Sequence, residues 1–248
     1  NDTTLTWSVV GEASGTYGSM AVVDGQWTYT VDNDSAAVQS LAEGESHDET
    51  FTIQVADGLG GSASQDVTVT VTGTNDAPVI SYEDGADAGA VEEDGQVTAS
   101  GQLTATDVDN DTTLTWSVLG SANSTYGSIA VDENGQWTYR LDEDASQALA
   151  DGIAHDETFT IQVADETGVA AAQDVTITVT GTNDLPVIDA GGDDGTVKEE
   201  DQLTATGQLT ASDIDANATQ TWTLVGSLSG TYGSIAVDEA TGQWTYTL

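Results

Sequence analysis

Aspartate and glutamate are the residues of this chain that are numerous enough, and of the right chemical type, to bind cations. The 248 residues include 43 acidic side chains, and the basic side chains that oppose them are Arg140, Lys198 and two histidines. A formal net charge of −41 strains a compact fold by self-repulsion unless cations collect on it. Carboxylates are hard oxygen ligands, which divalent cations prefer. The composition predicts a cation-stabilised protein and excludes nucleic acid as a partner, since polyanion binding requires Lys and Arg.

Cysteine is absent, which excludes disulfide frameworks, zinc ribbons and thiol catalysis. A secreted protein without disulfides needs another staple, and metal bound to carboxylates is the one this composition offers. The sequence shows no apolar run of bilayer-spanning length and no amino-terminal basic region followed by an apolar one. We therefore expect any export signal to lie outside this window.

Catalytic chemistry is disfavoured by the same residues. His47 and His155 share one sequence context, but Ser46 becomes Ala154 in the second copy and no nucleophile-elbow motif is present. Paired carboxylates could hydrolyse glycosides only within a cleft that gives them distinct environments, and the sequence indicates none. The prediction is that the chain is not an enzyme.

The elements that must position these carboxylates are repeated. NDTTLTWSV recurs at Asn1 and Asn110, HDETFTIQVAD at His47 and His155, and GTND at Gly73 and Gly181. TYGS and GQWTY each occur three times, and the copies are offset by about 106 to 110 residues. A proline follows each GTND motif, as suits an extended linker. We predict a partial repeat at residues 1–76, a complete one at 77–184 and a partial one at 185–248, the first lacking its opening strands and the last its closing ones.

Within the middle repeat, apolar residues alternate with Thr, Ser and Gln at a period of two, which is typical of strands with one buried face. Examples are the runs 114–118, 137–141, 159–163 and 175–179. Asn134-Gly135 predicts a hairpin, and about seven strands per repeat predict an all-β Greek-key sandwich. The six Trp residues recur at core positions, so we expect them in the core rather than on a sugar-stacking surface.

The motifs GQLTATDVDNDTTLTW, TYGSIAVDENGQWTY, HDETFTIQVAD and GTNDAPVI resemble the VCBS repeats of very large bacterial adhesins. The resemblance extends over the whole chain. It implies tandem immunoglobulin-like or cadherin-like sandwiches, export by a one-step secretion route of the RTX type, and a role in adhesion or biofilm formation.

The same segments resemble the calcium-binding motifs of cadherin repeats, which gather at the junction between neighbouring modules. The resemblance implies that oxygen ligands for Ca²⁺ come together at two junctions. For the first, the implied ligands are Asp48, Glu49, Asn75, Asp76, Asp107, Asp109 and Asp165. For the second, they are Glu93, Asp156, Glu157, Asn183, Asp184, Asp213 and Asp215. The joint is the short GTND and the Arg of the cadherin DRE motif is missing, so the number of ions per junction stays open.

The sequence is compatible with two functions, one of a structural protein and one of a binding protein. In the first, the repeats are secreted or cell-surface spacers that calcium stiffens, and their partners are the neighbouring repeats of the same chain. In the second, exposed loops such as residues 120–125 bind host or cell-surface glycans, or a like fibre by strand exchange. Near-identical copies favour the spacer, because a specific binding site would differ between copies.

Overall fold

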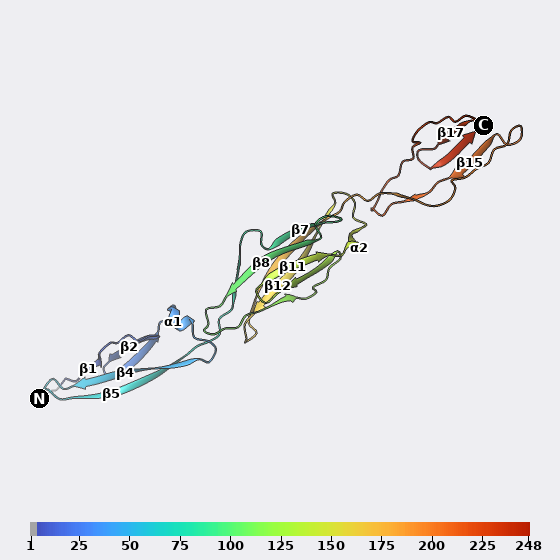
Figure 1. Cartoon of the computed structure of the whole chain (residues 1–248). Helices are drawn as coiled ribbons and strands as arrows, with labels where there is room; N and C mark the ends of the chain where they lie inside the picture. The colour runs from blue at the N-terminus through green and yellow to red at the C-terminus, as the bar shows by residue number, and fades with distance from the viewer. Residues whose placement is uncertain (1–3) are drawn as a thin grey trace.

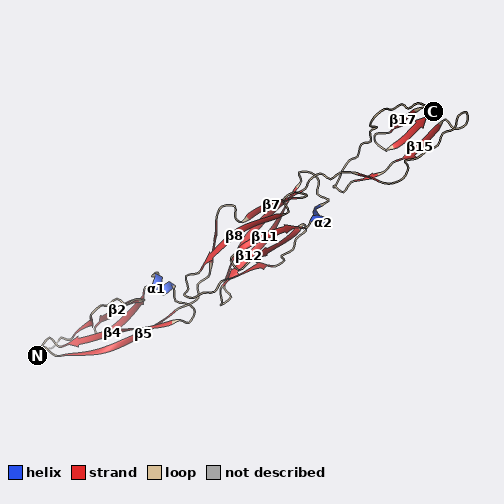
Figure 2. Cartoon of the chain, viewed as in Figure 1, coloured by secondary structure: helices blue, strands red, loops and turns tan. Residues whose placement is uncertain are grey.

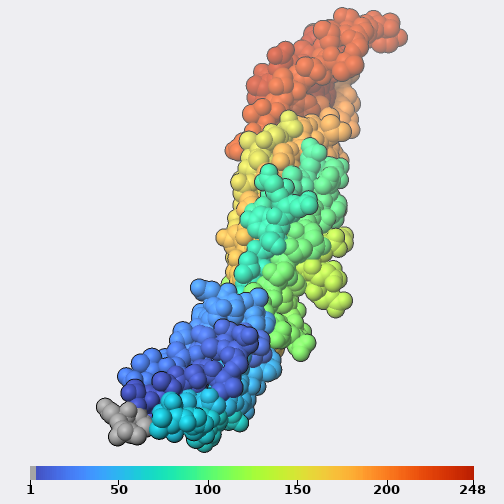
Figure 3. All heavy atoms as spheres, turned by 90° about the vertical axis from the view of Figure 1, so that its left-hand side faces the viewer, coloured from blue at the N-terminus to red at the C-terminus, as the bar shows by residue number. Residues whose placement is uncertain are grey.

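The chain folds into three β-rich units that follow one another end to end. The computed structural model describes residues 4–248, and Asn1 to Thr3, where the predicted first repeat begins, lie outside the described residues. Figure 1 shows the units in a row, and Figure 3 shows the same succession along one elongated body. We name them by the predicted boundaries, which remain a prediction: module one (4–76), module two (77–184) and module three (185–248). Joint one is residues 73–76 and joint two is residues 181–184.

Module two is a sandwich of two four-stranded sheets. One sheet has the order β10-β11-β8-β6 and the other β7-β13-β12-β9, with β7 parallel to β13 and the remaining pairs antiparallel. The elements are β6 (Val79–Tyr82), β7 (Ala88–Glu92), β8 (Thr98–Thr106), β9 (Thr115–Leu119), β10 (Gly127–Val131), β11 (Gln136–Leu141), α2 (Glu143–Ser146), β12 (Ala154–Ala164) and β13 (Ala170–Thr180). The predicted all-β, cadherin-like sandwich is confirmed, with eight strands rather than about seven.

The core of module two follows the predicted alternation. Phe159, Ile161 and Val163 point inward from β12 and are buried, while Thr160 and Gln162 between them are more exposed. Phe159 and Ile161 pack with the inward residues of β8, β11 and β13 in a core that includes Trp137, whose indole N–H donates to the Ala86 carbonyl at 2.8 Å. The two sheets of module two therefore enclose one apolar core between their inner faces.

Module one contains a three-stranded sheet, β1-β4-β5, and the hairpin β2-β3. Its elements are β1 (Thr6–Val10), β2 (Gly18–Val23), β3 (Gln26–Val31), α1 (Ala36–Gln39), β4 (Ser46–Ala56) and β5 (Ser62–Thr72). Trp27 occupies the place of Trp137 but is 46% exposed, because no neighbouring strand covers β3 as β8 covers β11. The expectation that every tryptophan is core is therefore wrong for Trp27 and for Trp7, which is 37% exposed.

Module three is a smaller assembly of short strands. Its sheets have the orders β15-β18-β17 and β14-β16. The elements are β14 (Val187–Ile188), β15 (Thr204–Gln208), β16 (Ala211–Ser212), β17 (Ser234–Val237) and β18 (Gln243–Thr247). Ala205 and Trp244 are buried, whereas Val225 and Tyr232 are largely exposed.

The two helices of the described residues are single turns, and Figure 2 shows each at the joint-facing end of its module. α1 begins after Ser35 and α2 after Asp142, and each of these side chains caps its helix by accepting a main-chain N–H. Within residues 4–248, no helix has the length and apolar character needed to cross a bilayer.

Candidate functional site

Two aspartates separated by one residue, which we call the DxD motif, lie against the GTND segment at both joints. They are Asp107 and Asp109 at joint one, and Asp213 and Asp215 at joint two. At joint one, the Asp76 main-chain N–H donates to Asp109 Oδ2 at 2.8 Å, and the Asp109 N–H donates to Asp107 Oδ1 at 3.0 Å. At joint two, the Asp184 N–H donates to Asp215 Oδ2 at 3.0 Å, and the Asp215 N–H donates to Asp213 Oδ1 at 3.1 Å. The same turn of chain thus presents a pair of carboxylates to the preceding module twice.

Each joint leaves buried carboxylate oxygens without a hydrogen-bond partner. At joint one these atoms are Asp107 Oδ2 and Asp109 Oδ1, and at joint two they are Asp184 Oδ2 and Asp215 Oδ1. A buried acceptor that loses water and gains no donor destabilises a fold by about 1 to 3 kcal/mol, and more when it is charged. Hard oxygen atoms in this condition fit a divalent cation such as Ca²⁺, which would replace the missing donors.

The electrostatics of both joints point the same way. Burial, together with repulsion from Asp107, Asp76 and Asp165, raises the pKa of Asp109. At joint two, burial and the neighbouring carboxylates Asp184, Asp94 and Asp215 raise the pKa of Glu93. Burial and three neighbouring acids likewise raise the pKa of Asp184. Among residues 4–248, the ion pairs are His47–Glu45 and Lys198–Asp201, so no ion pair offsets the negative charge of these aspartates.

Asp165 joins the first joint from the far end of β12. Its Oδ2 accepts the side-chain amide of Asn75 at 3.0 Å, and its Oδ1 accepts the N–H groups of Thr167 and Val169 at 2.8 and 3.0 Å. Burial opposes ionisation of Asp165, yet these hydrogen bonds outweigh it and hold its pKa below the usual range. Asp165 is therefore a carboxylate that stays charged beside Asp109.

Glu93 occupies the second joint from the module-two side. Its side chain is fully buried and accepts Gln147 Nε2 at 3.0 Å and the Thr182 N–H at 3.2 Å. Its main-chain N–H donates to Thr180 at the end of β13. Glu93 is thus fixed next to Asn183 and Asp184, as the implied ligand set requires.

Four of the predicted ligands do not belong to the joints. Glu157 accepts the Ser124 hydroxyl, the Tyr126 N–H and the Tyr139 hydroxyl at 2.5, 2.8 and 2.7 Å. In module one, Glu49 accepts the two equivalent donors, the Tyr17 N–H and the Tyr29 hydroxyl, and also the Thr16 N–H. The carboxylates of both residues are therefore engaged inside their own modules.

Asp48 and Asp156, which the resemblance to cadherin motifs also assigned to the joints, do not lie there. They are exposed on the outer face of their sheets, where Asp48 accepts the Thr70 hydroxyl at 2.6 Å and Asp156 the Thr178 hydroxyl at 2.7 Å. The physical reason is the two-residue period of a strand, which turns adjacent side chains to opposite faces. One acid of each HDE motif therefore points into its module and the other into solvent.

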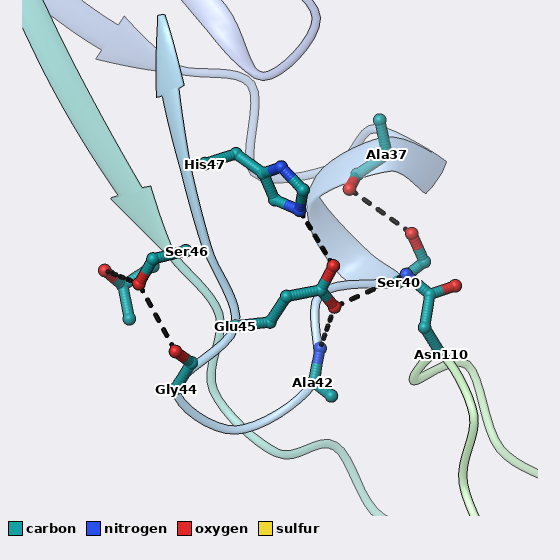
Figure 4. A network of polar contacts seen from close by, with 9 residues as sticks. Ala37, Ser40, Ala42, Gly44, Glu45, Ser46, His47 and Asn110 are labelled. Carbon is teal, nitrogen blue, oxygen red and sulfur yellow. Dashed lines mark hydrogen bonds and ion pairs between the residues drawn. The ribbon is translucent and has the colours of Figure 1, made fainter.

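A polar contact across joint one was not anticipated. Glu45 of module one accepts His47 Nε2 at 2.8 Å, the Ala42 N–H at 3.2 Å and the side-chain amide of Asn110 of module two at 3.5 Å (Figure 4). The Asn110 main-chain N–H also donates to the Ser40 carbonyl at 3.0 Å. The sequence contains one sign of this contact: Glu45 and Asn110 are both replaced in the next copy, by Ile153 and Ala216, as expected for two residues that contact each other.

The carboxylates alone do not complete a metal centre. Across residues 4–248, no group of three or more Asp, Glu or His side chains has the spacing of a finished site. A cation at a joint therefore needs main-chain carbonyls, the Asn75 or Asn183 side chain, or water among its ligands. Calcium sites commonly reach six to eight oxygens in this way.

Comparison with known proteins places the modules among cadherin-like and immunoglobulin-like folds. Residues 75–181 match a family model described as a bacterial cadherin-like domain, and residues 1–70 match one described as a bacterial Ig domain. No curated protein matches the chain. The middle of the chain is thus similar to bacterial cadherin-like domains.

Solved structures agree on the fold. Mouse Cadherin-23 EC22-24 matches with 18% identity and a TM-score of 0.51, over 98% of this chain and 75% of that one. The cis-dimer structure of Protocadherin gammaB7 EC3-6 matches with 18% identity and a TM-score of 0.52, over 100% and 58%. The Protocadherin GammaB4 extracellular domain matches with 17% identity and a TM-score of 0.50, over 98% and 38%, so this chain spans well under half of that protein. At these identities the likeness concerns the fold alone.

Proposed function

We propose that this chain is a run of calcium-stiffened, extracellular spacer modules from a VCBS-type bacterial surface adhesin. The observation that carries the proposal is that each joint has two buried carboxylate oxygens without a hydrogen-bond partner. Domains of the bacterial cadherin-like and Ig types, which the chain matches, are typically structural or adhesion modules rather than enzymes. Cadherin-like domains generally bind Ca²⁺ between repeats, which agrees with the position of these oxygens.

The residues that would hold the cation come from both sides of each joint. We assign this role to Asn75, Asp76, Asp107, Asp109 and Asp165 at joint one, and to Glu93, Asn183, Asp184, Asp213 and Asp215 at joint two. Bound calcium supplies positive charge and replaces absent hydrogen-bond donors. The chain's own part is to bring carboxylates of neighbouring modules together, which the hydrogen bonds from Asp76 to Asp109 and from Asp184 to Asp215 do.

Stiffening follows from where these residues sit. Without a cation, acids from two modules repel one another across a linker of few residues, so the relative orientation of the modules is weakly held. Ligands shared between the modules bind only when the modules are aligned, so calcium stabilises the aligned state by mass action. An array of such modules would project a terminal binding domain away from the cell, in adhesion or biofilm formation.

The test uses the whole chain with and without calcium. Small-angle scattering measures its length, a melting curve its stability, and calorimetry the number of ions bound. We expect a longer, more uniform particle and a higher melting temperature in millimolar calcium, both reversed by EDTA. Asp174→Asn is a matched control, because Asp174 is an outward-facing acid that accepts the Thr160 hydroxyl far from the joints. Identical scattering and melting curves in calcium and EDTA would refute the proposal.

The whole-protein role needs its own experiment. Antibodies against module two should label intact cells, and deletion of the array should reduce attachment while a flexible linker of equal contour length restores it only partly. Full restoration by the flexible linker would show that stiffness is not the function.

A further inference from the structure

We propose that module two carries a binding site for a neutral saccharide in the pocket beside Arg140. The pocket has a volume of about 450 Å³ and lies between the loop before β10, the end of β11 and the start of α2. This volume falls within the range of small-molecule sites, about 300 to 1,000 Å³. The side chains that face it with free polar groups are Asn123, Ser128, Arg140, Glu143 and Asp144.

Arg140 is the unusual member of this group. In a chain with 43 acidic residues, its guanidinium forms no ion pair and no hydrogen bond with any residue of 4–248. It lies on β11 opposite Ser128 of β10 and Thr98 of β8. The neighbouring residues Tyr139 and Leu141 are buried, so Arg140 projects from the opposite, solvent-facing side of the sheet. Five guanidinium N–H donors are therefore available in the pocket.

The walls of the pocket are held in place before any ligand binds. Buried Glu157 fixes the loop by accepting the Ser124 hydroxyl and the Tyr126 N–H, and the Asp142 N–H donates to the Tyr126 carbonyl at 2.7 Å. Gly127 lines the pocket directly over the Tyr139 hydroxyl, where a Cβ atom would lie only 2.3 Å from the oxygen. A preformed loop reduces the ordering entropy that binding must overcome.

The mixture of groups selects the class of ligand. Sugar hydroxyls both donate and accept, so one saccharide can donate to Glu143 and Asp144 while it accepts from Arg140, Asn123 and Ser128. A metal ion is disfavoured by the guanidinium, and an acidic sugar is disfavoured by the two carboxylates and by the net charge of −41. The lining is mainly polar, which disfavours a purely apolar ligand.

Module one contains a natural comparison. A pocket of about 340 Å³ occupies the same place, lined by Ser19 and Asp32, but Thr30 stands where module two has Arg140. Module three also has threonine at this position, Thr247. Arg140→Thr therefore restores the residue that the same strand carries in both other copies, and we expect the variant to fold.

The experiment applies the whole chain to an array of neutral and acidic oligosaccharides and then titrates the best neutral binder by calorimetry, in calcium. We expect one neutral oligosaccharide to bind per chain, and Arg140→Thr to weaken it at least about tenfold, which corresponds to about 1.4 kcal/mol. Lys198→Thr is the matched control, since it removes the other basic residue from an exposed position in module three and should leave binding unchanged. Unaltered affinity in Arg140→Thr, stronger binding of acidic sugars, or no binding of any oligosaccharide would overturn the proposal. Because calcium stiffening is not read out here, none of these results bears on the spacer role.

Discussion

The two joints share main-chain contacts and differ in their side-chain contacts. In each, a GTND aspartate donates its N–H to the second aspartate of the DxD motif, at 2.8 Å in joint one and 3.0 Å in joint two. In each, the residue after that motif donates its N–H to the preceding module at 3.0 Å, from Asn110 to Ser40 and from Ala216 to Ala148. These contacts use main-chain donors, so they persist when the side chain changes from Asn to Ala.

One side-chain difference between the joints is the contact of Glu45 with Asn110. Glu45 and Asn110 form a polar contact across joint one, whereas the same positions at joint two are Ile153 and Ala216, and Ile153 is half-exposed. A contact between exposed polar groups contributes little to stability, typically well under 1 kcal/mol. The two joints therefore have the main-chain contacts and the neighbouring acids in common, whereas the Glu45–Asn110 contact is particular to joint one.

Removing one shared acid should have the largest effect, and only at its own joint. Asp109→Asn and Asp215→Asn each remove the charge of a proposed ligand that has one buried oxygen without a hydrogen-bond partner. We expect each variant to lose the calcium-dependent stabilisation of its joint, roughly 1 to 3 kcal/mol at calcium concentrations of about 10 to 100 times Kd. Calorimetry should show fewer ions per chain, and melting in calcium should show the lost stability.

The Asp174→Asn chain is again the reference for loss of one negative charge elsewhere. If both joint variants kept the full stoichiometry and the full melting shift, the shared aspartates would not be ligands.

Glu93→Gln should separate joint two from joint one by the sign of its effect. Gln147 and Thr182 donate to different oxygens of Glu93, so glutamine keeps an acceptor for one of these two donors, but it also removes a buried charge that Asp184, Asp94 and Asp215 repel. Without metal, we expect the variant to be more stable than the wild type by about 1 kcal/mol. In calcium we expect it to be less stable, because a carboxylate ligand is lost. Paired melting curves in EDTA and calcium measure both signs, and a variant destabilised in both conditions would assign Glu93 a purely structural role.

Repetition in the sequence explains which parts of the site could be predicted. The sequence repeats the GTND residues, which precede a proline, and the aspartates Asp107 and Asp109 at a nearly constant offset. The structure brings these repeated residues together at each joint. Glu49 and Glu157 recur equally well, yet they bind Tyr29 and Tyr139 inside their modules. A repeated motif identifies a position without giving the direction of its side chain, and here the strand period decides that direction.

Features that differ between copies were harder to predict. The alternation in β12 and β13 predicted the sandwich of module two, but the exposure of Trp27 depends on which strand lies beside β3, and its own GQWTY motif does not contain that information. The Glu45–Asn110 contact joins residues 65 positions apart across a joint. Local patterns do not determine such a distance, because it depends on how the two modules are aligned.

Transplanting the polar contact into joint two should have a small and specific effect. Ile153→Glu and Ala216→Asn, made singly and together, form a double-mutant cycle. We expect a coupling free energy of at most about 0.5 kcal/mol between them in calcium, as for other exposed polar pairs. Chemical denaturation of the four chains measures it. A coupling of several kcal/mol would mean that the side chains, and not the main-chain frame, align the modules.

The smallest expected effect is a pH dependence confined to joint one. The hydrogen bond from His47, and then that from the Ala42 N–H, lower the pKa of Glu45 in the folded chain. An acid whose folded pKa is lowered stabilises the fold at pH values above its unfolded pKa, about 4.5, and this contribution is lost as the pH falls through the folded pKa. Joint two has Ile153 at this position, which does not titrate and so makes no pH-dependent contribution to stability.

Glu45→Gln isolates that contribution, since glutamine keeps an acceptor for the Ala42 N–H but has no carboxyl proton to titrate. We expect the melting temperature of the variant to lie slightly below that of the wild type near pH 7, and the two curves to converge once the pH falls below the lowered pKa of Glu45. An Ile153→Gln chain, changed at the equivalent position of joint two, should show no such convergence. A difference between Glu45→Gln and the wild type that stayed constant from neutral to acidic pH would assign the contact to packing rather than to charge.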